Sequence, residues 1–337
     1  MTKRERVLAA LAGRPVDRVP VSAWAHLLPD ERTVEGLARA ELKWLDTYDW
    51  DWLKVNPRAT VFAEGFGAKF DLNTYYGVLP RLTALTRPFT LDDLEAGDPG
   101  RGAWGEHVEL LTTLRASVGE TPFVQTLFSP ASVLGFLAGR PTATTQIGVA
   151  DAHNAAFFEL IRTRPKLAHQ ALTQIAAGLV KLAKASVEAG ADGLFFAITR
   201  IAREGLLTTA EFDEFCRPYD QLVLRAVSDA HFNVLHLCGP KAYWNQAVTY
   251  PVHAINWASV GQGNPDVAQA RQTTDLALVG GIDEGALLAQ GTPDDVEAAV
   301  RAALERGGDR KFLLAPGCTV ESARPENLKA LRRAAER

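Results

Sequence analysis

One histidine and two cysteines in this chain have the residue types and the spacing of a metal site. His236 and Cys238 lie two positions apart in the apolar run 233–238, and Cys318 closes a second run that ends in Ala315-Pro316-Gly317-Cys318. In an extended backbone, side chains two residues apart point to the same face. A neutral imidazole and two thiolates are ligands that zinc prefers, and three protein ligands leave a fourth position open for a substrate. The three residues are therefore candidate ligands of a catalytic zinc ion.

The same residues have a simpler interpretation as a core histidine and two small buried cysteines, because free cysteine is among the most buried residue types. The His-x-Cys and distant Cys pattern is also shorter than the paired Cys-x-x-Cys motifs of well-defined zinc sites. The third cysteine, Cys216, lies in a helical stretch beside aromatic residues, so we expect it in the core. The fold must decide between the two interpretations of the other three residues.

Composition restricts the class of protein. The chain has 337 residues, 47% of them hydrophobic and 23% charged, which is typical of a globular protein with a large core. Its net charge of −4 gives no electrostatic reason to expect a nucleic-acid partner. No apolar run reaches the roughly 18 residues of a membrane span, and no signal peptide is recognisable. Three cysteines do not form a disulfide framework, so we expect a cytoplasmic protein with free thiols.

The elements that must position the three ligands follow a repeating pattern. Short apolar runs alternate with stretches that have apolar residues at helical spacing, beginning with a helix at 2–12 whose Thr2 and Glu5 form a capping box. Eight such strand–helix units predict an α/β fold, a single (β/α)8 TIM barrel over residues 1–337, with an extra N-terminal helix and helical insertions at 65–121 and 138–190. The expected strands are 18–24, 52–56, 123–128, 193–198, 233–238, 254–258, 276–280 and 312–315.

A doubly wound open sheet is the alternative architecture. It would usually carry a glycine-rich phosphate turn after its first strand, whereas this chain has Ala25-His26-Leu27-Leu28-Pro29 there. In a (β/α)8 barrel, catalytic groups come from the C-terminal ends of the strands. His236 and Cys238 end the expected fifth strand and Cys318 follows the eighth, so the barrel places all three at its mouth and favours the metal interpretation.

The sequence also resembles the uroporphyrinogen decarboxylase superfamily over nearly its whole length. The resemblance implies a (β/α)8 barrel, and the superfamily includes both the haem-pathway decarboxylase and zinc-dependent methyltransferases. It rests on several motifs: Arg4-Glu5-Arg6 with Asp17-Arg18-Val19-Pro20, Phe128-Ser129-Pro130, Phe212-x-x-Phe215-x-x-Pro218-Tyr219, Leu235-His236-Leu237-Cys238-Gly239, Gly280-Gly281-Ile282-Asp283, and Ala315-Pro316-Gly317-Cys318 with Pro325-Glu326-Asn327.

The decarboxylase branch needs cationic and hydrogen-bonding groups for a tetrapyrrole with eight carboxylates, and this chain departs from that pattern. Ser22 and His26 stand at the places of two arginines, Asn56 near the place of an aspartate, Phe136 at that of a tyrosine, and Cys318 at that of a histidine. Arg58 and Arg200 would restore some positive charge, but in a different site. Uroporphyrinogen decarboxylation, which would yield coproporphyrinogen, is therefore the alternative function.

The zinc-dependent methyltransferase branch agrees better with the sequence. Resemblance to it implies that His236, Cys238 and Cys318 bind Zn²⁺ and activate a small-molecule thiol. It further implies that a corrinoid is the methyl donor, either free or on a partner corrinoid protein, since no corrinoid-binding segment is recognisable in the chain. The sequence leaves open whether the protein is a monomer or a homodimer. A third hypothesis is a non-catalytic barrel that binds a metal or a corrinoid.

Several further residues are candidates for the site, each with a structural alternative. His26 and Asp283 are candidate catalytic residues, although a solvated loop histidine and a helix N-cap explain them equally well. Trp257 would form a wall of the pocket, with core packing as the alternative. The expected substrate contacts are Asn56, Arg58, Phe136, Arg200 and Trp257.

Overall fold

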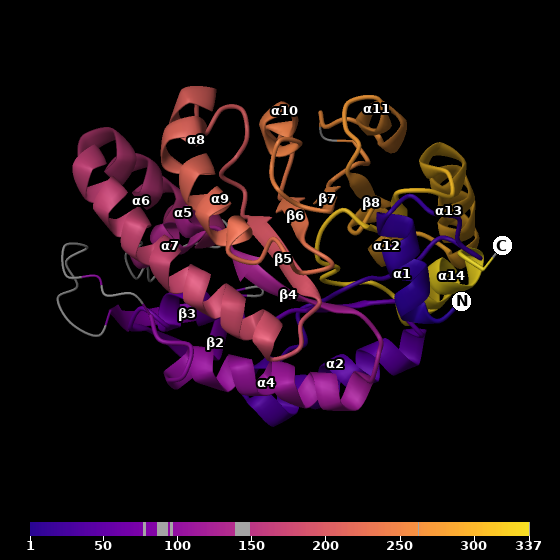
Figure 1. The fold of residues 1–337 in the computed structure, drawn as a ribbon, viewed down its shortest axis with the longest axis horizontal. Helices are drawn as coiled ribbons and strands as arrows, with labels where there is room; N and C mark the ends of the chain where they lie inside the picture. Colours follow the sequence, from indigo (N-terminus) through magenta and orange to yellow (C-terminus); the bar gives the residue numbers. More distant parts are fainter. Residues whose placement is uncertain (77–78, 86–93, 95–96, 139–148, 262, 337) are drawn as a thin grey trace.

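Seven parallel strands form a curved sheet at the centre of the molecule, surrounded by helices (Figure 1). The computed structural model describes residues 1–76, 79–85, 94, 97–138, 149–261 and 263–336. The strands pair in the order in which they follow one another around a barrel, which confirms the expected fold class. They are β1 (Leu53–Val55), β4 (Phe123–Phe128), β5 (Gly193–Ile198), β6 (Val234–Leu237), β7 (Ala254–Trp257), β8 (Ala277–Ile282) and β9 (Phe312–Pro316).

An extended segment around Val21 lies between β9 and β1 at the place of the remaining barrel strand. Val21 forms a parallel bridge with Leu314 of β9, and on its other side its carbonyl accepts from the backbone N–H of Asp51, at 3.0 Å. The expectation of a full strand at 18–24 is wrong, because this segment forms only the one bridge. Pro20 has no N–H to donate to a ladder, and the N–H of Val21 donates to the Asp51 carboxylate instead, at 2.8 Å.

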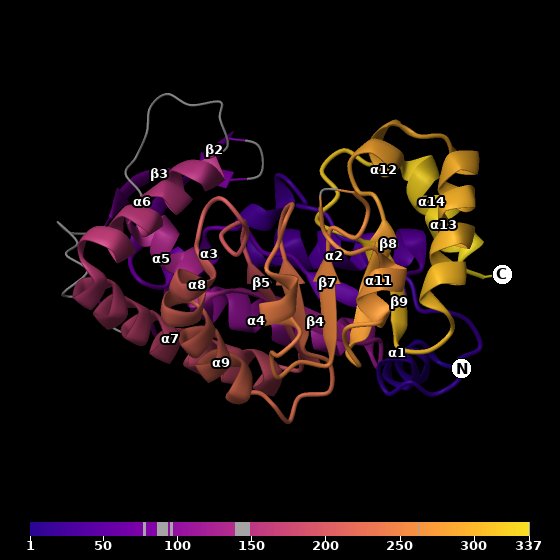
Figure 2. The same cartoon turned by 90° about the horizontal axis from the view of Figure 1, so that it is seen from above.

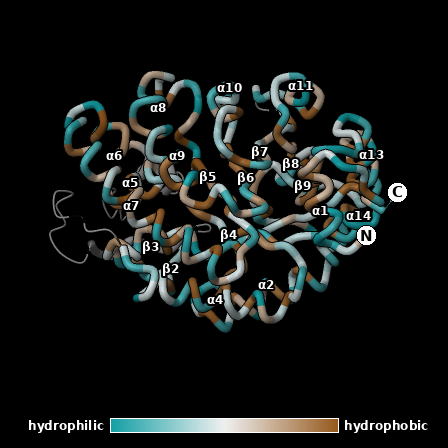
Figure 3. The backbone as a smooth tube through the Cα atoms, viewed as in Figure 1, coloured by the Kyte–Doolittle hydropathy of each residue, from teal (hydrophilic) through white to brown (hydrophobic). Residues whose placement is uncertain are grey.

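The helices cover the outside of the sheet, and most are amphipathic, so that hydropathy alternates along them (Figure 3). Within the described ranges, no helix is long and apolar enough to cross a membrane. The longer helices are α1 (Lys3–Leu11), α2 (Val34–Tyr48), α4 (Gly102–Val118), α5 (Pro130–Ala138), α6 (Val149–Thr163), α7 (Pro165–Glu188), α8 (Thr209–Phe215), α9 (Arg217–Arg225), α13 (Pro293–Gly307) and α14 (Pro325–Ala334). The short ones are η1 (Asp30–Arg32), α3 (Val61–Glu64), α10 (Trp244–Ala247), α11 (Val267–Arg271) and α12 (Ala286–Gln290).

The N-terminal helix α1 closes the bottom of the barrel. Val7 and Ala10 of α1 are fully buried and belong to the same hydrophobic cluster as Val124 of β4 and as Trp52 and Phe232, which lie just before β1 and β6. The expected capping box is present, since Thr2 and Glu5 each accept a backbone N–H of the other residue. The helix therefore begins where the sequence predicts, and its apolar face seals the end of the barrel opposite the C-terminal ends of the strands.

The first insertion contains a hairpin that the sequence analysis did not predict. Strands β2 (Ala68–Tyr76) and β3 (Leu79–Leu85) pair antiparallel in a separate sheet, with register shifts that interrupt the ladder. Figure 2 shows this hairpin at one end of the molecule, away from α1 and the two termini. Helix α4 completes the insertion, and α6 and α7, which follow α5, occupy the second insertion as expected.

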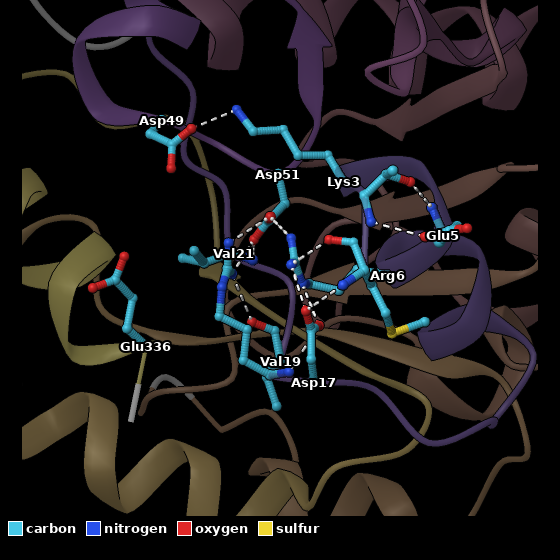
Figure 4. A network of polar contacts seen from close by, with 12 residues as sticks. Lys3, Glu5, Arg6, Asp17, Val19, Val21, Asp49, Asp51 and Glu336 are labelled. Atoms are coloured by element: carbon cyan, nitrogen blue, oxygen red, sulfur yellow. Dashed lines mark hydrogen bonds and ion pairs between the residues drawn. The ribbon is translucent and has the colours of Figure 1, made fainter.

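Buried ion pairs join α1 to the Val21 segment and to the start of β1 (Figure 4). Arg6 donates to Asp17 at 2.7 Å and to Asp51 at 2.7 Å, and Arg18 donates to the other Asp51 oxygen at 2.5 Å. The Asp51 side chain has no solvent exposure, and the two guanidinium groups balance the charges of Asp51 and Asp17 together. The network fixes the segment that takes the place of the missing strand.

Candidate metal centre

Alternate residues of the strands point into the barrel, and those nearest the C-terminal ends form the site. His236 lies on β6 and Cys238 directly after it, so both face the same interior. Cys318 follows β9 after Gly317, whose N–H donates to the carbonyl of Ile282 at 3.1 Å. The parallel register of β6 through β9 thus brings the distant cysteine to the first two residues, as the barrel predicted.

The three donor atoms have the spacing of a zinc site. The Sγ atoms of Cys238 and Cys318 are 3.9 Å apart, and Cys318 Sγ is 3.8 Å from His236 Nε2. All three atoms lie within 4.8 Å of one another. Tetrahedral zinc, with Zn–S near ~2.3 Å and Zn–N near ~2.0 Å, requires about 3.8 Å between two sulfurs and about 3.6 Å between sulfur and nitrogen. The residues therefore fit a zinc ion without a large rearrangement, and both cysteines are free thiols.

Asn256 on β7 orients the histidine. Its Oδ1 lies 2.6 Å from His236 Nδ1, while its Nδ2 donates to the carbonyls of Val279 at 2.8 Å and Pro316 at 3.1 Å. Because two carbonyls fix the amide nitrogen, the amide oxygen faces the imidazole and accepts from Nδ1–H. The Nε2 lone pair is then left for a metal, and the ring also stacks on Phe195.

Replacing Asn256 by alanine is expected to weaken zinc binding by about 10- to 100-fold, because the imidazole loses the partner that sets its tautomer. Competition with a chelator of known zinc affinity measures the change. Asn245→Ala, an exposed asparagine on α10, is the matched control and should bind zinc like the parent protein. Equal zinc affinity in Asn256→Ala and the parent would contradict the orienting role.

The two cysteines share their protons unequally. The hydrogen bond from Cys318 lowers the pKa of Cys238 to about 7, with a smaller contribution from the charge of Arg200. The same pairing raises the pKa of Cys318 well above its usual value, and burial raises it further. At neutral pH Cys238 is therefore about half ionised while Cys318 keeps its proton, so the negative charge of the pair is centred on Cys238.

In the metal-free, reduced protein we expect iodoacetamide to alkylate Cys238 with a rate that rises through about pH 7. Below that pH both thiols are protonated and unreactive, and above it Cys238 is a thiolate, whereas an ordinary thiol would need a pH near ~8.5. Mass spectrometry of quenched samples identifies the labelled cysteine. Cys216→Ala should behave like the parent, because Cys216 is fully buried in the core. A midpoint at or above ~8.5 would show that the thiols are not coupled in this way.

The donors face a cavity of about 260 Å³ at the mouth of the barrel. Four of the residues expected at the site line this cavity, and they come from different elements. They are His26 after the Val21 segment, Asn56 after β1, Phe136 of α5 and Arg200 after β5. The cavity is predominantly apolar, with Phe128 and Phe136 stacked on one side.

Three other expected site residues lie outside the lining of this cavity. Arg58 is held by Glu64 at 2.6 Å and faces a smaller neighbouring cavity. Trp257 does not form a wall but is fully buried in the core, where it packs on Trp244 and donates from Nε1 to a backbone carbonyl. Asp283 accepts hydrogen bonds from the backbone N–H groups of Gly285 and Ala286 at the start of α12. It therefore has the capping role that the sequence left open beside a catalytic one.

Lys54 of β1 is a site residue that the sequence analysis missed. Its side chain is almost fully buried, lines the cavity, donates to Asn56 Oδ1 at 2.6 Å and lies 4.8 Å from the ring centre of Phe195. Burial lowers its pKa to about 7. A lysine in the middle of an expected buried strand was the available signal, since charged side chains rarely occur there without a partner or a function.

The fold and the site together define a (β/α)8 barrel with a candidate zinc centre at the C-terminal mouth. The model of the uroporphyrinogen decarboxylase (URO-D) family matches residues 2–337, and the chain belongs to this family. Among its relatives is the methylcobamide:CoM methyltransferase MtaA of Methanosarcina barkeri, which is 28% identical over 98% of this chain and 96% of the relative. MtbA of Methanosarcina acetivorans, also a methylcobamide:CoM methyltransferase, is 24% identical over 96% and 94%.

Matches to uroporphyrinogen decarboxylases are shorter. The enzyme of Parasynechococcus marenigrum is 26% identical over 65% of this chain and 59% of the relative. Among solved structures, a methyltransferase from Methanosarcina mazei superposes with a TM-score of 0.80 at 24% identity, covering 99% of this chain and 98% of that chain. This likeness confirms the fold, and the family is one of enzymes.

Proposed function

We propose that this protein is a zinc-dependent methyltransferase that transfers a methyl group from a corrinoid-type donor to a small thiol. The observation that carries the proposal is the arrangement of His236, Cys238 and Cys318, whose donor atoms have the spacing of three corners of a zinc tetrahedron at the barrel mouth. The names of the full-length relatives, which are methylcobamide:CoM methyltransferases, support the same reaction and a corrinoid donor.

The residues of the site suit thiol activation. His236, Cys238 and Cys318 would hold the ion, which when bound would lower the pKa of a substrate thiol so that its thiolate is abundant at neutral pH. Two thiolates and a neutral imidazole cancel the charge of Zn²⁺, so an added substrate thiolate brings a net negative charge. Arg200 lines the same cavity and provides positive charge to balance it, and Lys54, whose pKa burial lowers to about 7, adds a further charge when it is protonated.

The size of the cavity supports separate places for the two substrates. About 260 Å³ lies just below the range of roughly 300–1,000 Å³ that is usual for ligand pockets, which suits a small acceptor. A corrin macrocycle is far larger and would present its methyl group from outside the opening. The donor would therefore bind across the barrel mouth, free or carried by a corrinoid protein.

The decarboxylase alternative has less support from the site. Of the positions where that branch has polar or cationic groups, Ser22 is buried and donates to the carbonyl of Trp52, and Asn56 is engaged by Lys54 and by the carbonyl of Ala25. Phe136 offers no hydroxyl to the cavity. We expect no coproporphyrinogen after anaerobic incubation with uroporphyrinogen, and its formation would reverse the order of the two functions.

Cobalt substitution tests the proposed function directly. We expect the visible spectrum of the Co²⁺-loaded protein to change when a small anionic thiol, 3-mercaptopropionate, is added, because a sulfur ligand enters the open position. Cys318→Ser lacks one ligand and should not give the same cobalt spectrum. If cobalt binds but the thiol leaves the spectrum unchanged, the result supports a non-catalytic metal-binding barrel and contradicts thiol activation.

A further inference from the structure

Glu31 is a buried carboxylate that the proposed reaction has not yet used. It lies in η1, its side chain has no solvent exposure, and its Oε2 is 3.1 Å from His26 Nδ1. Its other oxygen, Oε1, is buried without a hydrogen bond of normal geometry, although the Tyr75 hydroxyl interacts with this carboxylate. Burying a carboxylate whose two oxygens are incompletely satisfied is costly, so such a group in a native site calls for a functional reason.

His26 connects this carboxylate with the candidate site. Its side chain is 11% exposed and lines both the metal-site cavity and a second cavity of about 490 Å³, and Glu321 lines both as well. The backbone N–H of Glu31 donates to the carbonyl of Leu27, which fixes the turn between the two residues. Within the described part of the chain, His26 Nε2 has no hydrogen-bond partner, so this nitrogen is available at the junction of the two cavities.

We propose that His26, held by Glu31, accepts the proton that the substrate thiol releases on binding. This role rests on the proposed function and adds an acceptor to it. The S–H bond breaks, its electron pair stays on sulfur, and the proton forms a new bond to His26 Nε2. Nδ1–H remains hydrogen-bonded to Glu31, whose negative charge stabilises the imidazolium. His26 holds this proton while the thiol is bound, and returns it to solvent through the second cavity once the methylated thiol has left.

The chemistry of the acceptor matches the task. Histidine is the side chain that most often serves as a general base, and a carboxylate on Nδ1 fixes the tautomer with a free Nε2. In this arrangement His26 is the catalytic residue, because it touches the thiol. Glu31 is a positioning residue, because it acts through the imidazole.

The charged groups around the pair are arranged on two sides. On the protein side, burial and the charge of Glu31 raise the pKa of Tyr75, and burial raises the pKa of Glu41 to about 8, with a small contribution from Glu31. On the cavity side, the charged lining residues are Lys54, Arg200 and Glu321, and the second cavity adds Asp30, Arg39 and Lys43. Among the described residues around His26, Glu31 is thus the negative group that forms a hydrogen bond with its ring.

Nitrogen NMR on the zinc-loaded protein, labelled with 15N-histidine, tests the inference without reference to turnover. His26→Gln identifies the His26 signals among the 7 histidines. On addition of 3-mercaptopropionate we expect the Nε2 signal to move from the shift of an unprotonated nitrogen to that of a protonated one. If the cobalt-loaded protein binds the thiol but the His26 signal of the zinc form stays unprotonated, the inference is overturned while the proposed function stands. If no thiol binds, both are overturned.

Glu31→Gln separates positioning from packing. The amide keeps the size of the carboxylate but cannot stabilise an imidazolium, so the proton should appear in the buffer instead of on His26. Calorimetry of thiol binding in buffers of different ionisation enthalpy should then give about one released proton per chain, against close to none for the parent. Glu35→Gln, an exposed glutamate on α2, is the matched control and should behave like the parent. Equal proton release in Glu31→Gln and the parent would overturn the role of Glu31, and His26→Gln gives the same readout if the Glu31 variant does not fold.

Discussion

Replacing Cys318 with serine is expected to reduce the zinc content of the purified protein from about one ion per chain to less than about a tenth of that. Serine has nearly the shape of cysteine but is a poor zinc ligand, and only two donors would remain. The distances among His236, Cys238 and Cys318 are those of a site that needs all three ligands. Elemental analysis after dialysis under reducing conditions measures the zinc content.

Cys216 provides the control for this experiment. It is a cysteine of the same chain that is fully buried between α8 and α9, away from the three ligands, and its pKa is raised by burial. Cys216→Ala should keep about one zinc per chain, so a general loss of folding would be recognised by a low zinc content in both variants. A parent protein that binds no zinc when zinc is supplied would end the metal hypothesis and leave the three residues as core packing.

Replacing Asp51 with alanine is expected to lower the free energy of unfolding by about 3–5 kcal/mol. Asp51 is fully buried and is bound by the guanidinium groups of Arg6 and Arg18 and by the N–H of Val21. Its removal leaves Arg18 without a carboxylate partner, leaves Arg6 with Asp17 alone, and releases the segment that completes the ring between β9 and β1. Denaturant unfolding followed by circular dichroism measures the change.

Asp46→Ala is the matched control, because Asp46 is an exposed aspartate on α2. We expect it to change the free energy of unfolding by less than about 0.5 kcal/mol. If Asp51→Ala changes the free energy of unfolding by no more than this control, the buried ion pairs do not stabilise this part of the barrel. A loss of zinc binding in Asp51→Ala without loss of stability would point instead to an effect on the site.

The sequence predicted the barrel well because its strands are short buried runs in a regular alternation with helices. Strands β4 and β5 have the expected limits, and the others differ by one or two residues at an end. The segment at 18–24 was misjudged because its hydrogen bonds go to a side chain and to a single bridge, which a run of apolar residues does not reveal. The β2–β3 hairpin was missed because it is peripheral and irregular.

The ligands were predicted because a barrel brings the ends of its strands together, and Glu31 was missed because its burial depends on how a short turn packs. His236 and Cys238 come from one strand, so their common direction follows from the spacing alone. Glu31 lies in a short turn, and nothing in the sequence shows that its side chain is buried against His26. Asp283 and Trp257 have residue types that are common in both sites and cores, and only the packing assigns them to a cap and to the core.

The seal formed by α1 has a consequence for the order of catalysis. With Val7 and Ala10 packed under the inward-facing residues, the end of the cavity toward α1 is closed, so the thiol and its methylated form would pass through the barrel mouth. A macrocyclic donor across that opening would trap whatever is inside, so the acceptor has to bind first and its methylated form has to leave last. Steady-state kinetics should then show the methylated thiol competing with the thiol, and random-order kinetics would contradict a single entrance.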